Sequence, residues 1–321
     1  MPSDTLSRST RFSKTLAHLP PHTVTRAPRA HAVDRFRFLR MMLSDLRRNA
    51  APAPHRPNPA AWNNDRVTAA WLGHATVLVN FFGITILTDP VMFLRCGIRL
   101  GPLTLGPKRY VTFPIKPREL PRIDLILLSH AHMDHLDLRS LRALSREAIV
   151  VTARATADIF RRIQFREVIE LDWRETRLVE TPGGSVSVSA FPLRHWGARL
   201  QYDDFRSYNA YVLERAGKRL CHMGDTARTD ASPLASRGPI DLIFAPIGAY
   251  NPWIRAHCNP EEAVAMANEA AARYLMPIHH QTFKLSWEPM QEPITRFLHA
   301  IQAQPERVAL TEIGETFMLP E

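Results

Sequence analysis

Four side chains that can bind a metal ion stand within six residues of one another: His130, His132, Asp134 and His135. They follow residues 123–128, an apolar run that is typical of a buried strand. Because alternate side chains of an extended chain point the same way, His130 and His132 can reach one ion. The turn that follows can present Asp134 and His135 toward a second ion. Imidazole and carboxylate ligands together suit zinc and similar metals.

Three more residues of the same types stand where later apolar runs end. His195, Asp225 and His279 each come at or just after such a run. Loops at the ends of strands converge to form sites in layered α/β proteins, so we expect these side chains near the first four. His280 competes with His279 for the last position.

The predicted strands and helices that must position these residues fall into two groups along the chain, and each group contains both kinds of element. Helices are expected from about Leu138, from Pro260 with Asn259 as N-cap, and over 294–302. Two sheets packed face to face, with helices outside and mostly hairpin-like connections, accommodate this pattern. The predicted strands are 67–72, 76–80, 84–88, 123–128, 149–152, 167–171, 186–193, 208–213, 219–223, 242–245 and 275–278.

Composition places the chain among globular proteins. Its 321 residues are 45% apolar and 22% charged. The three cysteines form no C-x-x-C pair, which favours a reducing compartment, and we interpret Cys221 and Cys258 as packing residues. No apolar run of about eighteen residues or secretory signal is evident. A cytoplasmic protein is therefore expected, with peripheral contact at the inner membrane face as an addition.

The positive charge is concentrated near the N-terminus. Residues 1–66 hold twelve Lys and Arg against four Asp and Glu, whereas the remainder holds 29 against 27. A nearly neutral body argues against a nucleic-acid partner, because a nucleic-acid channel needs basic residues on the catalytic domain itself. A basic arm on such a body suits an anionic membrane surface.

The arm divides into three parts, and we take it as residues 1–60, followed by the folded domain at 61–321. Residues 1–30 lack apolar periodicity and are expected to be poorly ordered. Residues 33–48 place apolar residues at helical spacing among arginines, and residues 50–60 are a Pro-rich linker. The helix near 33–48 could lie in a membrane interface, pack on its own domain, or belong to a mitochondrial transit peptide.

The motifs resemble those of the metallo-β-lactamase superfamily, whose pattern is H-x-H-x-D-H followed by a separated His, Asp and His. Within it the chain is most similar to the N-acyl-phosphatidylethanolamine-hydrolysing phospholipase D family and its bacterial relatives. Met133, at an often aromatic position, and Gln281, where a Gly is usual, depart from that family. The matching stretches lie at 71–77, 87–90, 106–109, 170–173, 224–226, 246–250, 260–263 and 278–283.

The resemblance implies a four-layer αββα sandwich and two Zn²⁺ ions per chain, with Fe or Mn as alternatives. It also implies that His257 lies near a substrate phosphate, although a structural cap before the helix at Pro260 is an equal alternative. The implied ligands are His130, His132 and His195 for one ion, Asp134, His135 and His279 for the second, and Asp225 for both.

The leading functional hypothesis is a zinc phosphodiesterase that releases phosphatidic acid from an N-acylphosphatidylethanolamine, with hydroxide supplied by metal-activated water. Asp134 and Asp225 are its candidate catalytic residues. A soluble hydrolase of a small lactone or cyclic phosphodiester is the alternative, and a non-catalytic interaction protein is a third. A phospholipid or other phosphodiester substrate and a homodimer are the expected partners.

Two further motifs remain ambiguous from sequence. Gly73 and His74 could support the ligands through hydrogen bonds or could form a buried turn. Lys108 and Arg109 could bind a phosphate or could face solvent.

Overall fold

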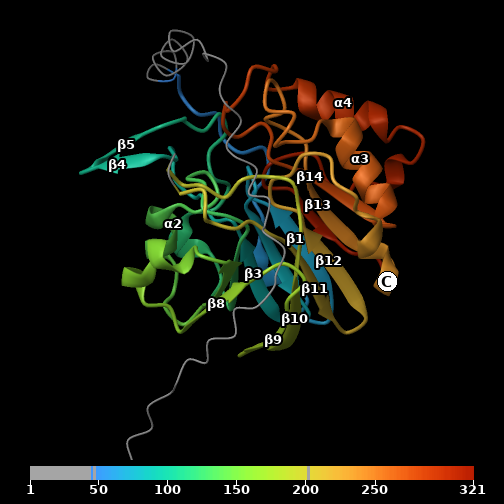
Figure 1. Cartoon of the computed structure of the whole chain (residues 1–321), viewed down its shortest axis with the longest axis horizontal. Helices are drawn as coiled ribbons and strands as arrows, with labels where there is room; N and C mark the ends of the chain where they lie inside the picture. Colours follow the sequence, from blue (N-terminus) through green and yellow to red (C-terminus); the bar gives the residue numbers. More distant parts are fainter. Residues whose placement is uncertain (1–44, 46–47, 201–202) are drawn as a thin grey trace, which may run out of the picture.

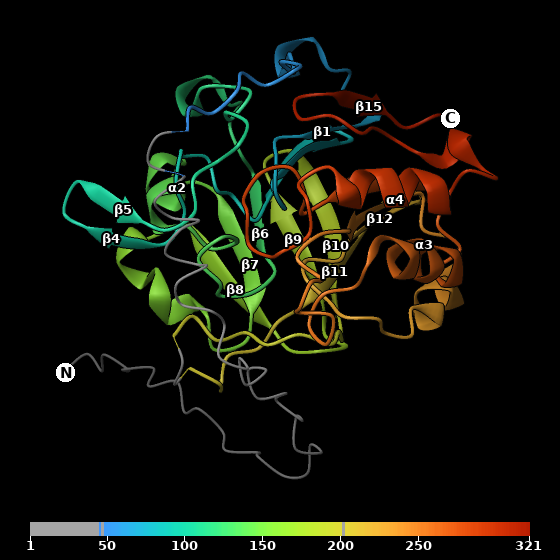
Figure 2. The same cartoon turned by 90° about the horizontal axis from the view of Figure 1, so that it is seen from above.

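Two β-sheets stack face to face in the middle of the computed structural model (Figures 1 and 2). The structure describes residues 45, 48–200 and 203–321. The predicted amphipathic helix at 33–48 therefore lies outside the described residues except for Asp45 and Arg48. Among the described residues, no helix is both long and apolar enough to span a bilayer.

The first sheet combines antiparallel and parallel pairing. Its first four strands pair antiparallel, and from β3 to the other edge all strands run parallel. In spatial order the strands are β15 (Thr316–Met318), β1 (Val67–Trp71), β2 (Val77–Phe81), β3 (Ile84–Thr88), β6 (Leu125–Leu128), β7 (Ile149–Ala153) and β8 (Glu167–Leu171).

The second sheet has the same mixed character. Its first three strands run parallel and the remaining pairs are antiparallel. In spatial order they are β14 (Tyr274–Ile278), β13 (Leu242–Pro246), β12 (Lys218–His222), β11 (Ala210–Arg215), β10 (Gly184–Phe191) and β9 (Thr176–Thr181). A separate hairpin joins β4 (Ile98–Leu100) to β5 (Leu103–Leu105).

Helices cover the outer faces of both sheets. Leu125 and Leu127 point into the core between the sheets, whereas Ile126 and Leu128 point outward against α2 (Leu138–Ala143). The second sheet is covered by α3 (Pro260–Glu269) and α4 (Glu292–Ala300). This arrangement confirms the predicted four-layer αββα sandwich. Single turns of 3₁₀ helix lie at Pro59–Ala61, Pro117–Glu119, Ala157–Ile159, Arg161–Ile163 and Pro305–Arg307, and a longer one at Ser232–Arg237.

The sequence predicted most elements but not their directions. The Asn259 side chain accepts a hydrogen bond from Glu262 N at 2.9 Å, so the predicted N-cap of α3 is confirmed. The predicted predominance of hairpin-like connections was wrong, because only six of the fourteen connections between consecutive strands of the described residues are hairpins. Strands β4, β5, β9 and β15 were not predicted; β4, β5 and β15 are only three residues long, and β9 is largely exposed.

The Pro-rich stretch before the first sheet lies against the domain. Ala51 N donates to Tyr110 O at 2.8 Å, and His55 N donates to Ile313 O at 3.2 Å. These bonds attach the end of the arm beside the strand-end loops that carry the candidate ligands.

Candidate metal centre

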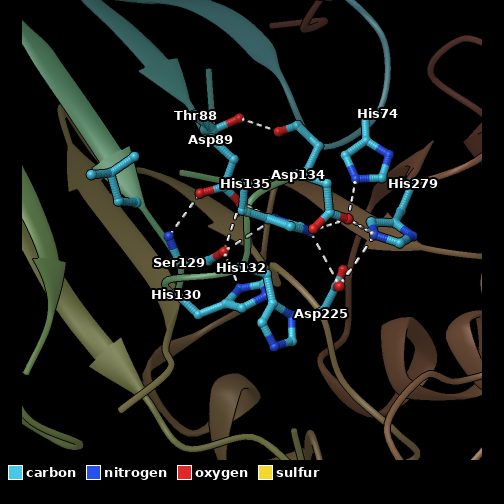
Figure 3. A network of polar contacts seen from close by, with 12 residues as sticks. His74, Thr88, Asp89, Ser129, His130, His132, Asp134, His135, Asp225 and His279 are labelled. Atoms are coloured by element: carbon cyan, nitrogen blue, oxygen red, sulfur yellow. Dashed lines mark hydrogen bonds and ion pairs between the residues drawn. The ribbon is translucent and has the colours of Figure 1, made fainter. Parts of the chain in front are cut away.

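The candidate ligands converge at one edge of the two stacked sheets (Figure 3). Each stands in a loop that the chain enters on leaving a strand, so that both sheets contribute to the same site. His74 follows β1, Asp89 follows β3, His130 to His135 follow β6, His195 follows β10, Asp225 follows β12, His279 follows β14, and His257 precedes α3.

A first cluster joins His130, His132, His195 and Asp225, whose ligand atoms lie within 4.8 Å of one another. His195 Nε2 is 3.3 Å from His132 Nδ1. Burial lowers the pKa of His132 to about 3 and that of His195 to about 4, so both imidazoles are neutral near pH 7. A neutral imidazole is the form that binds a metal ion.

A second cluster joins His74, Asp134, His135 and His279, again within 4.8 Å. His74 Nε2 lies 2.9 Å from Asp134 Oδ2, and the Nε2 atoms of His135 and His279 each lie 3.7 Å from that oxygen. Burial acts to lower the pKa of His279, but the carboxylates of Asp225 and Asp134 outweigh it and raise the pKa to about 9. This cluster therefore attracts positive charge.

Asp225 lies between the two clusters. Its Oδ2 is 3.1 Å from His279 Nε2, 3.2 Å from His135 Nε2 and 3.8 Å from His195 Nε2. Both carboxylate oxygens are buried without a hydrogen bond, as are the Nε2 atoms of His130, His135 and His279. Buried polar atoms without hydrogen bonds cost free energy, and cations between them would remove that cost. The donor set thus fits divalent metal ions.

A buried carboxylate behind the second cluster fixes its orientation. Asp89 Oδ2 accepts hydrogen bonds from His135 Nδ1 at 2.8 Å and from His222 Nε2 at 2.9 Å, and Ser129 donates to both oxygens of Asp89 at 2.7 Å. His135 Nε2 is thereby directed toward the centre. The sequence reasoning missed Asp89 and His222, although Asp89 directly follows a strand, as several of the candidate ligands do.

The loops that carry the ligands adopt backbone conformations that are unusual for L-residues. His74, Asp89 and His279 have φ values of 55°, 34° and 62°. Gly224, at φ 57°, precedes Asp225, and a Cβ there would lie 2.6 Å from Ser129 Cβ. These conformations are retained because neighbouring loops bind one another: His279 N, for example, donates to His74 O at 2.9 Å.

Two histidines that the sequence left ambiguous are now placed. His257 Nδ1 lies 3.7 Å from Asp225 Oδ2. The helix cap belongs to Asn259 instead. His280 stacks on Trp71, with ring centroids 4.5 Å apart, and stands outside the clusters that contain His279.

The ambiguous motifs are resolved as well. Gly73 and His74 form a buried turn, and the His74 side chain also belongs to the second cluster. Arg109 is buried and does not face solvent: its Nη2 donates to Val91 O at 2.6 Å, and its guanidinium lies over the Phe283 ring.

Gln281 lines a pocket beside His279 that holds about 20 Å³, room for about one water molecule. Met133 is half-buried.

Access to the centre is uneven. The Asp134 side chain retains 17% exposure, whereas those of His135 and Asp225 retain none. A substrate can therefore contact the centre on the Asp134 side, where His132 and Met133 are also half-buried.

Comparison with known proteins places this site in a family. Residues 85–280 match the model of the β-lactamase superfamily domain. An uncharacterised protein of Mycobacterium tuberculosis is 32% identical over 85% of this chain and 75% of its own length. Two N-acyl-phosphatidylethanolamine-hydrolyzing phospholipases D are also similar: one of Caenorhabditis elegans (31% identity, 68% of this chain, 64% of the relative) and the mitochondrial one of Saccharomyces cerevisiae (32%, 70% and 49%).

Solved structures agree with the fold. A metallo hydrolase from Ignicoccus hospitalis superimposes with a TM-score of 0.60 at 19% identity, covering 79% of this chain and 99% of that one. An isothiocyanate hydrolase from Delia radicum gut bacteria gives 0.62 at 16% identity, covering 78% and 98%. The chain therefore belongs to the β-lactamase superfamily, has the metallo-β-lactamase fold, and is a metal-dependent hydrolase of that superfamily.

Proposed function

We propose that this protein is a zinc-dependent phosphodiesterase that hydrolyses a phospholipid of the N-acylphosphatidylethanolamine type. The observation that carries the metal-dependent chemistry is Asp225, a buried carboxylate shared by two clusters of histidines and without a hydrogen bond of its own. The ligand set we assign is His130, His132 and His195 for one ion, Asp134, His135 and His279 for the other, and Asp225 for both. His74 is an additional candidate in the second group.

The chain's own side chains assist hydrolysis in distinct ways. Two divalent ions held here would supply hydroxide near neutral pH and offset the charge that develops on a phosphoryl group. Burial acts to raise the pKa of Asp134, but His135, His279 and His74 hold it well below its usual range, so the carboxylate is ionised. As the more exposed of the two carboxylates, Asp134 is positioned to accept a proton from the attacking water. His257, whose Nδ1 lies 3.7 Å from Asp225 Oδ2, is our candidate for contact with the substrate phosphate.

The substrate class comes from the relatives. Two proteins that are 31% and 32% identical to this chain are named for hydrolysis of N-acylphosphatidylethanolamine, although the chain spans only 64% and 49% of their lengths. Water would cleave the bond between phosphorus and the head-group oxygen, giving phosphatidic acid and an N-acylethanolamine. A protein with this substrate must work at a membrane surface, which suits a cytoplasmic protein whose basic arm contacts anionic lipid.

The test is an assay of the zinc-loaded full chain on N-acylphosphatidylethanolamine in mixed micelles, with phosphatidic acid as the measured product. Asp225→Asn should abolish the product, and His299→Asn, which changes a histidine on the exposed face of α4, should not. Hydrolysis of a lactone or a cyclic phosphodiester without any phosphatidic acid would favour the soluble small-molecule alternative. Absence of all metal-dependent hydrolysis would reject both.

A further inference from the structure

The β4–β5 hairpin projects from the body (Figures 1 and 2), and its apolar side chains are exposed. Ile98, Leu100, Leu103 and Leu105 are 52%, 57%, 66% and 49% exposed. A two-stranded hairpin has little stability of its own, and clustered exposed apolar residues mark interaction sites. The hairpin is therefore a candidate docking element.

All four side chains lie on one face of the hairpin. Ile98 pairs with Leu105 and Leu100 pairs with Leu103, and alternate residues of a strand share a face. Arg99 pairs with Thr104 on the opposite face. The hairpin is amphipathic, with one apolar face and one polar face.

The base of the hairpin is close to the metal centre. Cys96, two residues before β4, packs with Val91 and Phe283. The Phe283 ring in turn lies 5.2 Å, between centroids, from the ring of His74 in the second cluster. A surface that the hairpin contacts would therefore lie beside the centre.

The hairpin and its flanks are positively charged. Residues 91–118 contain no Asp or Glu, whereas Arg95, Arg99 and Lys108 stand in or beside the hairpin. One carboxylate at its base, Asp45, is buried and accepts hydrogen bonds from Lys108 N at 3.1 Å and from Arg48 Nη2 at 2.8 Å. The hairpin thus combines an apolar face with unbalanced positive charge.

The basic arm joins the body at the same place. Arg48 donates to the carbonyl oxygens of Lys108 and Arg109 at 2.7 Å each. Residues 1–44, which precede this attachment, hold eight Lys and Arg against two Asp and Glu. Two features with affinity for an anionic surface therefore meet at the base of the hairpin.

We propose that the β4–β5 hairpin is a membrane-docking element whose apolar face enters the interface of an anionic bilayer and brings the metal centre to the lipid. The choice of a lipid surface rests on the proposed phospholipid substrate and on the charge. A second copy of the chain would present the same cationic hairpin and would be repelled, whereas anionic lipid satisfies both the apolar face and the cations.

The test is co-sedimentation of the metal-loaded full chain with vesicles of phosphatidylglycerol and phosphatidylcholine, which contain none of the proposed substrate. The double variant Leu100→Ser/Leu103→Ser should lose at least about tenfold in vesicle affinity, because two leucines no longer enter the interface. Leu178→Ser is the matched control: Leu178 on β9 is 66% exposed, as is Leu103, and its change should leave binding intact. Ile98→Ser/Leu105→Ser is a second variant of the same face, in case the first pair unfolds the hairpin.

Three results would overturn the docking proposal. They are wild-type protein that stays in the supernatant with anionic vesicles, hairpin variants that sediment as well as wild type, and a hairpin variant that converts a dimer to a monomer without changing sedimentation. Sedimentation does not require catalysis. Vesicle binding that depends on the hairpin, together with no release of phosphatidic acid, would therefore reject the proposed substrate and leave docking in place.

Discussion

The two halves of the centre hold their histidines in different ways. In the first cluster, His195 Nδ1 donates to the backbone oxygen of Ala256 at 2.8 Å, and His130 Nδ1 lies 2.9 Å from the Ser129 hydroxyl. Both partners are neutral. In the second cluster, the Asp89 carboxylate accepts from His135 Nδ1, and Asp134 itself adds a negative charge.

This difference has a consequence for metal affinity. A carboxylate behind a histidine ligand raises the basicity of that ligand more than a neutral oxygen does. We expect the ion at the second cluster to bind more tightly, and the ion at the first cluster to be lost first on chelation. Asp225 contacts histidines of both clusters and links the two halves.

The largest effect is expected from removing that link. Asp225→Ala should lower kcat/KM by about 10³-fold or more, because both groups of histidines lose their shared anion. The measurement is hydrolysis of a soluble aryl phosphodiester by the zinc-loaded protein. Asp230→Ala, at an exposed carboxylate five residues further along the chain, is the control. A loss below tenfold would show that the halves work independently.

Asp89→Asn should affect metal binding in the two halves of the centre unequally. It replaces the anion behind His135 and should weaken the tighter ion by about 10- to 100-fold, with a smaller effect on the other ion, to which Asp89 is linked through Ser129. Competition against a chromophoric chelator measures both affinities. Equal weakening of the two ions would contradict the assigned role of Asp89.

Gly224→Ala tests how tightly the halves are packed together. The new Cβ would approach Ser129 Cβ to 2.6 Å at a φ of 57°. We expect a loss of roughly 1–3 kcal/mol in the free energy of unfolding. Urea unfolding of the metal-free protein gives the value, and an unchanged midpoint would mean that the Ser129 loop moves without cost.

The smallest effect is the pH dependence of the metal-free protein, which should have one sign for His132 and His195 and the opposite sign for His279. His74, whose pKa burial lowers to about 3, adds to the first effect although it belongs to the second cluster. The folded pKa values of His132 and His195, about 3 and about 4, lie below the unfolded value of about 6.5. The unfolded state then binds more protons below pH 6.5, so each histidine costs roughly 1 kcal/mol of stability by pH 5.5. The pKa of His279, about 9, gives stability that is full below pH 6.5 and is lost as the pH rises through 9.

Thermal unfolding of the metal-free protein between pH 5 and pH 9.5 measures the loss of stability toward acid pH and the loss toward alkaline pH. His132→Asn should reduce the loss toward acid pH, and His279→Asn should reduce the loss toward alkaline pH. A loss toward acid pH that His132→Asn leaves unchanged would contradict the assignment of a neutral, buried imidazole at that position.

What the sequence could predict was local in the chain. The His130 to His135 motif and the strand before it are contiguous, and strands buried on both faces are apolar throughout, so both could be recognised. The pair of Asp89 and His222 could not, because its members stand 133 residues apart on different sheets. The buried position of Arg109 was not predicted, because cations are rarely buried and because the carbonyl groups and aromatic rings around it come from elsewhere in the fold.

The parallel order of the sheets was also beyond local reasoning. Residue alternation along a strand shows which side chains share a face but not in which direction the neighbouring strand runs. The β4–β5 hairpin was missed for a related reason: its short strands place their apolar residues outward rather than in a core.

Zinc titration of the metal-free protein, with bound metal counted by mass spectrometry, tests the two unlike halves most directly. Wild type should bind two ions per chain in two separable steps. His132→Ala should lose the weaker step and keep the tighter one, and Asp89→Asn should weaken the tighter step. A single ion per chain, or two steps that both variants shift equally, would contradict a centre built from two different halves.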